Sequence, residues 1–410
     1  MGSSATDLDP IDVLASEAVP ATRRLAAIAC ASFLLIGWTG LLVPSLIRSV
    51  QADFVQTDGG LGLFYLVGAI FYALGSFGGG LATERIGRRI VLSGAAVLVG
   101  LGLAVQATAP SWELFMVAAA PAGLGSGVVD GGMNGLILDL FKRRPGGALN
   151  LLHLFFSLGA AGSPLIVGQL VGAAVDWRMI VLATAVAAVI VGGLLASQVM
   201  PSGRHQRPTE AHAAAAGIRL PILPILMLAL AIGFYVSSEI GVSSWLVRFL
   251  ESASNEVATT TLAAFWGALA LGRLLAARVA DRFRPVRFAT TCVSVAAIAL
   301  LGAVVVPWLP VSIGLFALSG FAFGPVYPMI MTIGGALYPR RIAAVTGGLA
   351  GSAVVGGIIY PPLMGFISDE AGIGVAMFGA GLLGVACALA LVGATVASRR
   401  LVTAEATEAT

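Results

Sequence analysis

Twelve apolar segments, each close to the roughly 20 residues that a helix needs to cross a bilayer, occupy almost the whole sequence. Charged residues make up only 10% of the chain, whereas soluble domains hold about one quarter. The sequence therefore predicts an all-α membrane protein with twelve transmembrane helices. The expected spans are 25–47, 61–82, 90–108, 113–140, 148–174, 178–200, 221–249, 258–280, 288–308, 311–338, 342–368 and 373–397.

The basic residues predict which side of the membrane each loop occupies. Nineteen of the 23 lysines and arginines fall at the two ends of the chain or in alternate loops. The opposite loops hold only Arg48, Arg178 and Arg248, while Arg273 lies inside the eighth span. Because cytoplasmic loops carry the excess of basic residues, both termini are expected in the cytoplasm. The composition, rich in alanine and arginine, is typical of a bacterial chain, so we expect a multi-pass protein of the inner (cell) membrane.

The chain also carries an internal repeat. Shifting the sequence by 197 positions places the arginines and the proline of one half on those of the other, as in Arg85 on Arg282 and Pro164 on Pro361. Such a shift indicates two parallel copies. The predicted organisation is a cytoplasmic tail (1–22), a first six-helix half (23–200), a cytoplasmic linker (201–220), a second six-helix half (221–398) and a second cytoplasmic tail (399–410).

The loop after the second span reads GLATERIGRR and resembles the signature loop of the major facilitator superfamily, G-x-x-x-D-R-x-G-R-R. The resemblance implies the fold of two parallel halves, a ligand site near the midplane between them, and a conformational latch on the cytoplasmic side. A plain basic loop is the alternative. Asp139 is expected to pair with Arg85 or Arg89, and the cognate loop of the second half is degenerate. The expected latch residues are Gly80, Glu84, Arg85, Gly87, Arg88, Arg89, Asp139, Asp281 and Arg282.

Polar residues that the repeat does not share are the candidates for a ligand site. Asp130 aligns with Tyr327, and Asn134, one helical turn further, aligns with Met331. A carboxylate near a helix centre costs roughly 2.5–3.5 kcal/mol on insertion and normally faces the bundle interior or water. His153 on the next span lies at a similar depth to Asn134. We expect these residues to bind substrate or a coupling ion; the alternative is a packing network without a ligand.

The seventh span supplies a second carboxylate, Glu239, with Tyr235 and Ser243 one turn to either side. It aligns with Leu42, and no arginine or lysine is evident at its depth, so a structural ion pair is the less favoured interpretation. Trp266 and Tyr327 are candidate aromatic platforms for the substrate, and Trp38 and Tyr360 are weaker ones. Trp245 is the least favoured of these platforms, because aromatic residues near span ends are more often anchors at the membrane interface; core packing is the alternative for Trp266 and Tyr327.

Two stretches resemble a narrower group. GLGSGVVDGGMN with LNLLHLFFSLGAAGSP, and FYVSSEIGVSSWL, are similar to segments of the fucose–galactose–glucose symporter branch and of sodium-dependent glucose transporter-like proteins. That resemblance implies symport of a small polar solute, a sugar or sugar-like compound. The first span lacks the acidic residue of proton-coupled members, so Asp130 is expected to take up the coupling proton. With the Asn134 oxygen beside it, it can equally help bind sodium.

Other functions fit less well. A glycine–proline pattern at 159–168 resembles that of drug:proton antiporters and leaves efflux open, and a non-transporting membrane sensor is a minor alternative. The GLGSG stretch follows no strand, so it does not predict a dinucleotide site. Three cysteines in apolar runs predict neither disulfides nor a metal site. We expect no enzyme activity, no cofactor beyond the coupling ion and no nucleic acid, and a monomer in the lipid bilayer with a small-molecule substrate.

Overall fold

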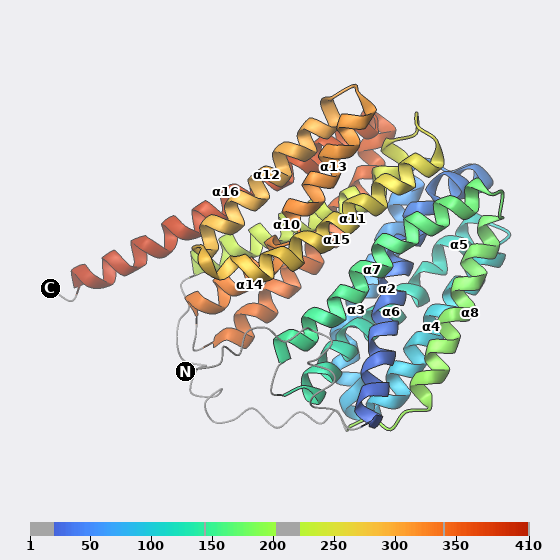
Figure 1. The fold of residues 1–410 in the computed structure, drawn as a ribbon, viewed down its shortest axis with the longest axis horizontal. Coiled ribbons are helices and arrows are strands. Elements are labelled where there is room, and N and C mark those ends of the chain that lie inside the picture. The colour runs from blue at the N-terminus through green and yellow to red at the C-terminus, as the bar shows by residue number, and fades with distance from the viewer. Residues whose placement is uncertain (1–19, 143–144, 202–221, 339–340, 409–410) are drawn as a thin grey trace, which may run out of the picture. The chain divides into compact units, whose positions relative to one another are not determined.

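The computed structural model describes residues 20–142, 145–201, 222–338 and 341–408, and within these ranges it contains helices and no strand. Twelve helical segments are long and apolar enough to cross a membrane, so the predicted fold class is confirmed (Figure 1). The spans are Thr22–Phe54, Asp58–Ile86, Arg88–Thr108, Trp112–Leu140, Gly146–Gly172, Trp177–Ala196, Ile222–Phe249, Asn255–Val279, Pro285–Val305, Leu309–Leu337, Ala344–Ala371 and Ile373–Ser398.

The chain divides into two compact units, Met1–Phe54 with Val67–His205 and Val55–Leu66 with Gln206–Thr410. The first nine residues of α3 (Asp58–Ile86) therefore belong to the second unit, which the predicted halves did not anticipate. The first unit further contains α2 (Pro20–Phe54), α4 (Arg88–Thr108), α5 (Trp112–Val117), α6 (Ala119–Leu140), α7 (Pro145–Gly172) and α8 (Trp177–Ala196). The second contains α10 (Ile222–Phe249), α11 (Asn255–Val279), η2 (Ala280–Arg282), α12 (Pro285–Val305), α13 (Leu309–Phe323), α14 (Val326–Leu337), α15 (Ile342–Ala371) and α16 (Ile373–Glu408).

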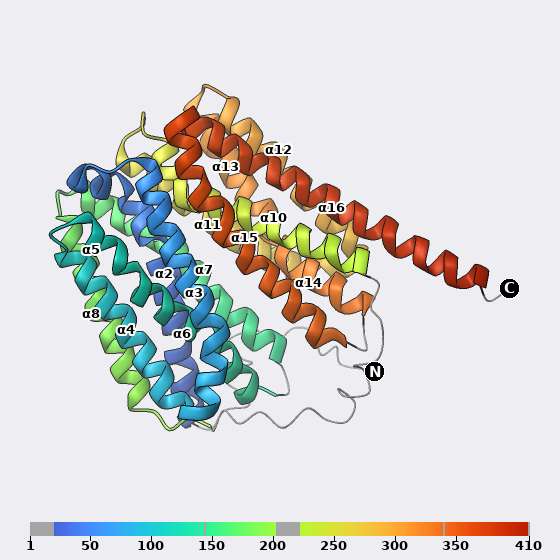
Figure 2. The same cartoon turned by 180° about the vertical axis from the view of Figure 1, so that it is seen from behind.

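Helix pairs form the interior of the first unit. α2 lies against α7 and α4 lies against α8 (Figure 2). Phe33, Met133 and Leu152, from α2, α6 and α7, are fully buried in one hydrophobic cluster. Because lipid is as apolar as these side chains, the pairing of membrane helices depends on close packing rather than on removing apolar surface from water.

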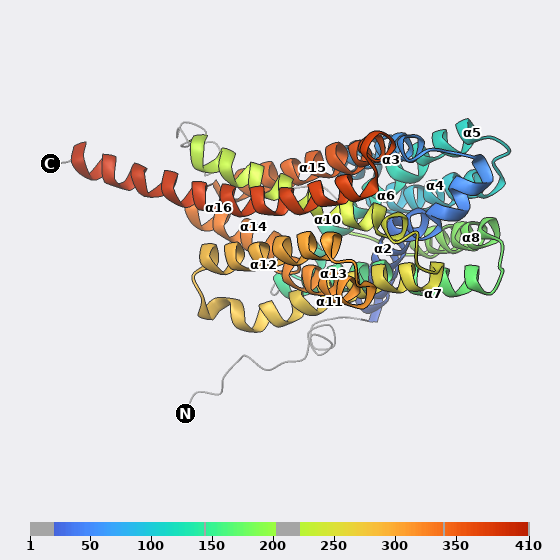
Figure 3. The same cartoon turned by 90° about the horizontal axis from the view of Figure 1, so that it is seen from above.

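In the second unit, α10 is the central helix and packs against α15 and α16, while α12 also lies along α16 (Figure 3). Its two longest buried runs, 235–239 and 241–247, include Tyr235 and Trp245, both fully buried. The burial of Trp245 does not fit the interfacial position that aromatic residues near span ends often take. Its indole N–H donates to the Pro361 carbonyl 2.7 Å away, so the residue is held in the protein interior.

Each unit contains the same close glycine contacts between its own helices, at positions that differ by 197 residues. A methyl group on Gly75 of α3 would overlap the Leu124 carbonyl of α6, and one on Gly272 of α11 would overlap the Phe321 carbonyl of α13. Such close approach of two backbones requires a residue without a side chain. Two further pairs of contacts are 197 residues apart. Gly123 lies against the Gly68 carbonyl as Gly320 lies against that of Phe265, and Gly127 lies against the Tyr72 carbonyl as Gly324 lies against that of Leu269.

Some helix ends differ from the predicted spans. α2 continues to Phe54 and α16 to Glu408, well beyond 47 and 397. The fourth span is interrupted between α5 and α6, and the tenth between α13 and α14. Pro121 and Pro325 lie close to these interruptions. Proline has no N–H to continue the helical hydrogen bonds, which explains why the helices break there. Residues 1–19 and 202–221, which include most of the predicted first tail and linker, lie outside the described ranges.

Candidate substrate and coupling sites

Four polar side chains of the first unit form one hydrogen-bonded group, the Asp130 cluster, made of Tyr72 (α3), Asp130 and Asn134 (α6) and His153 (α7). The Tyr72 hydroxyl donates to Asp130 Oδ2 at 2.7 Å. Asn134 Nδ2 donates to the Asp130 carbonyl at 3.0 Å and to Asp130 Oδ1 at 3.2 Å. His153 Nε2 lies 3.2 Å from Asn134 Oδ1. The structure therefore brings together the three residues that the sequence singled out.

The hydrogen bonds fix the roles of the Asn134 amide and the His153 ring. Asn134 directs its nitrogen at Asp130, so its oxygen accepts and His153 Nε2 carries the hydrogen. The edge of the imidazole meets the Phe33 ring, with centroids 5.3 Å apart at 90°. His153 is exposed in the chain, whereas Asp130 and Asn134 are half-buried. The ring thus forms the accessible end of the cluster.

All contacts of the Asp130 carboxylate come from neutral groups. Within the described ranges, no lysine or arginine lies within ion-pair distance of it. A carboxylate in apolar surroundings with neutral partners only is stabilised by gaining a proton or a cation. The remaining lone pairs of the carboxylate are suited to a hard cation, whereas the Asn134 oxygen accepts from His153 in this structure and would have to turn toward Asp130 to join them. Across the same ranges, no group of three His, Cys, Asp or Glu side chains is arranged to hold a metal ion.

The second unit holds a different group, the Glu239 cluster, made of Tyr235 and Glu239 (α10) and Arg273 (α11). Arg273 Nη2 lies 3.7 Å from Glu239 Oε1, so the prediction that Glu239 has no basic neighbour is wrong. The arginine also donates from Nε to the Gly324 carbonyl at 3.3 Å. Only 8% of the Glu239 side chain is exposed, against 28% of that of Arg273. The pair is in Coulombic contact but longer than a hydrogen bond.

Tyr235 leaves a polar group unused beside this pair. Its side chain is fully buried, and its hydroxyl lies close enough to Glu239 and Arg273 to interact with both, but it makes no hydrogen bond of good geometry among the described residues. A buried hydroxyl without a partner costs free energy, so such groups are rare in proteins. The Tyr327 ring lies beside Tyr235, with centroids 6.4 Å apart at 54°, and is half-buried.

The other aromatic candidates take structural positions. The Trp266 indole N–H donates to the Ser243 hydroxyl at 3.1 Å, and Ser243 donates to the Glu239 carbonyl at 2.7 Å. Trp266 is only 6% exposed, which leaves little of its face for a ligand in this conformation. Trp38 donates to the Thr184 hydroxyl at 3.1 Å, and Tyr360 donates to the Ala376 carbonyl at 2.7 Å.

The repeat contained a signal for Arg273 that the sequence analysis did not use. At the offset of 197, Arg273 aligns with Ser76, as Glu239 aligns with Leu42, so both members of the pair are unshared. Arg273 also precedes Arg282 by nine residues, about 13 Å along a helix. That is the spacing by which Asp130 precedes Asp139. Glu239 and Arg273 carry opposite charges that the first half lacks at the aligned positions, and both lie toward the middle of their spans. Together these observations predict an ion pair.

The signature loop of the first unit forms an ion pair, with a partner other than the expected one. Asp139 pairs with Arg88 at 2.6 Å, not with Arg85 or Arg89. Gly87, with φ of +103°, turns the chain so that α4 begins at Arg88 and directs this side chain inward, where it is only 4% exposed. Arg89 donates instead to the Ala196 carbonyl at 2.5 Å.

The other candidate latch residues lie at exposed positions where the structure describes them. Gly80 lies within α3 and its carbonyl accepts from the Thr83 hydroxyl, while Glu84 and Arg85 are exposed in the chain. In the second unit, Arg282 ends the short helix η2 and is exposed. The Asp281 side chain lies outside what the structure describes.

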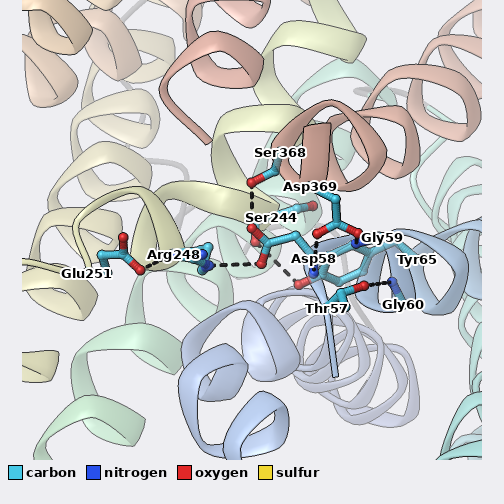
Figure 4. A network of polar contacts seen from close by, with 10 residues as sticks. All are labelled: Thr57, Asp58, Gly59, Gly60, Tyr65, Ser244, Arg248, Glu251, Ser368 and Asp369. Carbon is cyan, nitrogen blue, oxygen red and sulfur yellow. Dashed lines mark hydrogen bonds and ion pairs between the residues drawn. The ribbon is translucent and has the colours of Figure 1, made fainter. Parts of the chain in front are cut away.

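A further polar network in the second unit, the Asp58 network, was missed by the sequence analysis (Figure 4). Asp58, at the start of α3 and 4% exposed, accepts from Arg248 Nε at 2.8 Å and from the Ser368 hydroxyl. Asp369 accepts from the backbone N–H of Asp58 at 3.0 Å and of Gly59 at 2.9 Å, and so caps the α3 N-terminus. Three segments far apart in sequence supply these groups, which is why no local pattern revealed them.

Comparisons with known proteins identify the family. The family model described as Major Facilitator Superfamily matches residues 25–353 and 213–408. The chain belongs to the major facilitator superfamily. The predicted resemblance is confirmed, and the chain is a multi-pass membrane transporter rather than an enzyme. A solved D-xylose–proton symporter has the same fold, with a TM-score of 0.74 over 90% of this chain and 96% of that one, at 17% identity.

The curated relatives include one transporter without an assigned substrate and others whose named substrates differ. An uncharacterised transporter of the superfamily, YfkL of Bacillus subtilis, is 26% identical over 87% of this chain and 93% of its own length. A gentisate transporter of Corynebacterium glutamicum is 25% identical over 84% and 81%. A putative glucose/galactose transporter of Helicobacter pylori is 29% identical over 34% and 35%. The narrower resemblance to sugar symporters thus has support over about one third of the chain.

Proposed function

We propose that the protein is a secondary active transporter that moves a small polar solute by alternating access, driven by an ion gradient. The Asp130 cluster carries this proposal. A half-buried carboxylate that accepts hydrogen bonds only from neutral side chains is suited to take up and release a cation during transport. We assign the coupling ion as the proton, with sodium as the alternative that the Asn134 oxygen would help bind.

A sugar or sugar-like compound is the first candidate substrate. Carboxylate, amide and imidazole groups suit the hydroxyls of a sugar, and the partial relatives include a putative glucose/galactose transporter. A hydroxylated aromatic acid is the second candidate. It is favoured by the gentisate transporter, a relative over most of the chain, and by the arginine in the Glu239 cluster.

Uptake into proteoliposomes tests the function and the coupling ion together. Purified protein should accumulate substrate against its gradient when an inward proton gradient is imposed, with an acidic optimum and no sodium requirement. Saturable dependence on sodium at fixed pH would transfer the coupling to sodium. Binding without any transport under either gradient would contradict the proposal and indicate a membrane sensor. A thermal-shift screen against sugars, organic acids and lipophilic cations selects the compounds to test, and stabilisation by cations alone would favour efflux.

We further propose that the protein lies in the bacterial inner membrane with both termini in the cytoplasm, as the basic loops suggest. A cysteine introduced at Ser202, in a variant lacking Cys30, Cys292 and Cys387, tests the orientation. A membrane-impermeant reagent should label it only after the cells are permeabilised. Labelling in intact cells would reverse the orientation.

A further inference from the structure

We propose that the second unit binds the carboxylate of an organic anion at Arg273, and that Glu239 releases the arginine by taking up a proton as the anion arrives. This inference rests on the proposed transport function and names its substrate class. The class is a monocarboxylate that also carries hydroxyl groups, of which a hydroxybenzoate and a sugar acid are the two forms to distinguish.

The geometry leaves the arginine able to accept a ligand. Its contact with Glu239 is 3.7 Å long, and its Nε bond to the Gly324 carbonyl is 3.3 Å. A guanidinium has five N–H donors, and two parallel ones match the two oxygens of a carboxylate. The unpartnered Tyr235 hydroxyl, buried beside the pair, supplies a further donor to the incoming anion. An incoming carboxylate therefore gains shorter hydrogen bonds than Glu239 makes.

Charge balance links the anion to a proton. Empty, the cluster holds one positive and one negative side chain and is neutral. A monoanion bound at Arg273 would leave a net negative charge in an apolar region, which is costly. If Glu239 takes one proton from the aqueous phase, the anion pairs with the arginine and the total charge returns to zero. The step forms a hydrogen bond pair at Arg273 and an O–H bond on Glu239, so this cluster takes up one proton for each carboxylate, in addition to the coupling proton assigned to Asp130.

Other groups near the pair do not compete for this role. Among the described residues, the titratable side chains in the middle of the helices packed against α10 are Arg273 of α11, Tyr327 of α14, Tyr360 of α15 and Cys387 of α16. Phenols and thiols are neutral at physiological pH. Glu239 is therefore the acidic group that exchanges with the substrate.

Matched compound pairs test the substrate class. Gentisate is compared with hydroquinone, and gluconate with glucose, by calorimetry on the full-length protein in nanodiscs. At least one acid should bind, and its uncharged counterpart should bind at least tenfold more weakly. Binding should weaken as the pH rises. Gentisate binding selects the hydroxybenzoate, and gluconate binding selects the sugar acid. If glucose binds better than gluconate and is accumulated, the transport function stands and this inference fails.

Variants separate anion binding from structure. Arg273→Gln should lower affinity for the acid roughly tenfold to hundredfold, whereas Arg278→Gln, an exposed arginine on the same helix, should leave it unchanged. Glu239→Gln should keep binding but make it independent of pH and abolish accumulation, while exchange of the acid continues. The double variant removes both charges, so it leaves no unpaired charge and should stay folded, and it should not bind the acid. Unchanged affinity in Arg273→Gln or in the double variant would overturn the proposal, as would pH-dependent binding in Glu239→Gln.

Discussion

Two carboxylates within the transmembrane helices, the half-buried Asp130 and the buried Glu239, are balanced in opposite ways. Asp130, in the first unit, accepts hydrogen bonds from a tyrosine and an asparagine and has no cationic partner within the described ranges. Glu239, in the second unit, lies 3.7 Å from an arginine. A carboxylate among neutral donors becomes neutral only when it gains a cation, whereas an ion pair is neutral until a third charge enters. The first arrangement suits an ion carrier and the second suits an anion receptor.

The largest expected effect comes from removing the charge that can bind the coupling ion. Asp130→Asn keeps the hydrogen bonds to Tyr72 and Asn134 within reach but cannot take up a proton or hold sodium. Accumulation against a gradient should fall at least a hundredfold, while downhill exchange of substrate survives. In the same proteoliposomes, gradient-driven uptake measures accumulation and counterflow measures downhill exchange. An Asp130→Asn variant that still accumulates substrate would remove Asp130 from the coupling step.

Stability should separate the clusters next. Glu239→Gln leaves the Arg273 charge without its partner, and breaking a buried ion pair in this way costs about 3 kcal/mol. Asp130→Asn leaves no opposite charge behind and should cost about 1 kcal/mol, the scale of an altered hydrogen bond. Thermal unfolding in detergent compares the variants. Equal losses for both would mean that the 3.7 Å contact contributes nothing to the fold.

A smaller effect is expected at the signature loop of the first unit. The aligned loop of the second unit lacks the residues that would form the equivalent of the Arg88–Asp139 ion pair. Arg88→Gln or Asp139→Asn should slow transport roughly tenfold, equivalent to about 1.4 kcal/mol in a rate-limiting barrier. Substrate affinity should change little. Arg282→Gln is the matched control in the second unit, and Arg85→Gln tests the partner first expected for Asp139. A loss of affinity with a normal transport rate would refute a latch role.

The two tyrosines provide the finest comparison. Tyr72→Phe removes a hydrogen bond of 2.7 Å to Asp130 and should lower the free energy of unfolding by about 1 kcal/mol. Tyr235→Phe removes a buried hydroxyl that lies beside Glu239 and Arg273 without a hydrogen bond of good geometry, so the empty protein should lose less stability than with Tyr72→Phe. Its affinity for a carboxylate should fall about tenfold. Destabilisation by Tyr235→Phe with unchanged affinity would assign that hydroxyl to the fold instead of to the ligand.

The contrast between the clusters also shows which parts of a membrane site can be predicted from sequence. Asp130 and Asn134 lie on one helix four residues apart, so helical geometry alone predicts that they meet. Tyr72 and Arg273 reach their carboxylates from other helices. Packing sets the rotation of each helix about its axis, for example where Gly75 allows α3 to approach the Leu124 carbonyl closely. The hydropathy of the sequence does not reveal this rotation.

The same limit explains the latch and the helix ends. Spans were predictable because length and hydrophobicity suffice to identify them. The choice of Arg88 over Arg85 or Arg89 depends on one turn, which Gly87 makes with a positive φ. The Asp58 network was beyond local patterns, since its partners come from α10 and α15.

The cap on α3 has a consequence for biosynthesis. Asp369, which accepts from the first N–H groups of this helix, follows Gly59 by 310 residues. At roughly 5–20 residues per second, the ribosome needs about 15–60 s to make that interval. During this time, the carboxylate of Asp58 lacks the hydroxyl of Ser368, and the first N–H groups of α3 lack the carboxylate of Asp369, although α3 is among the earliest helices to leave the ribosome. We therefore expect the start of α3 to stay in contact with water, or beside the insertion machinery, until α15 has been made.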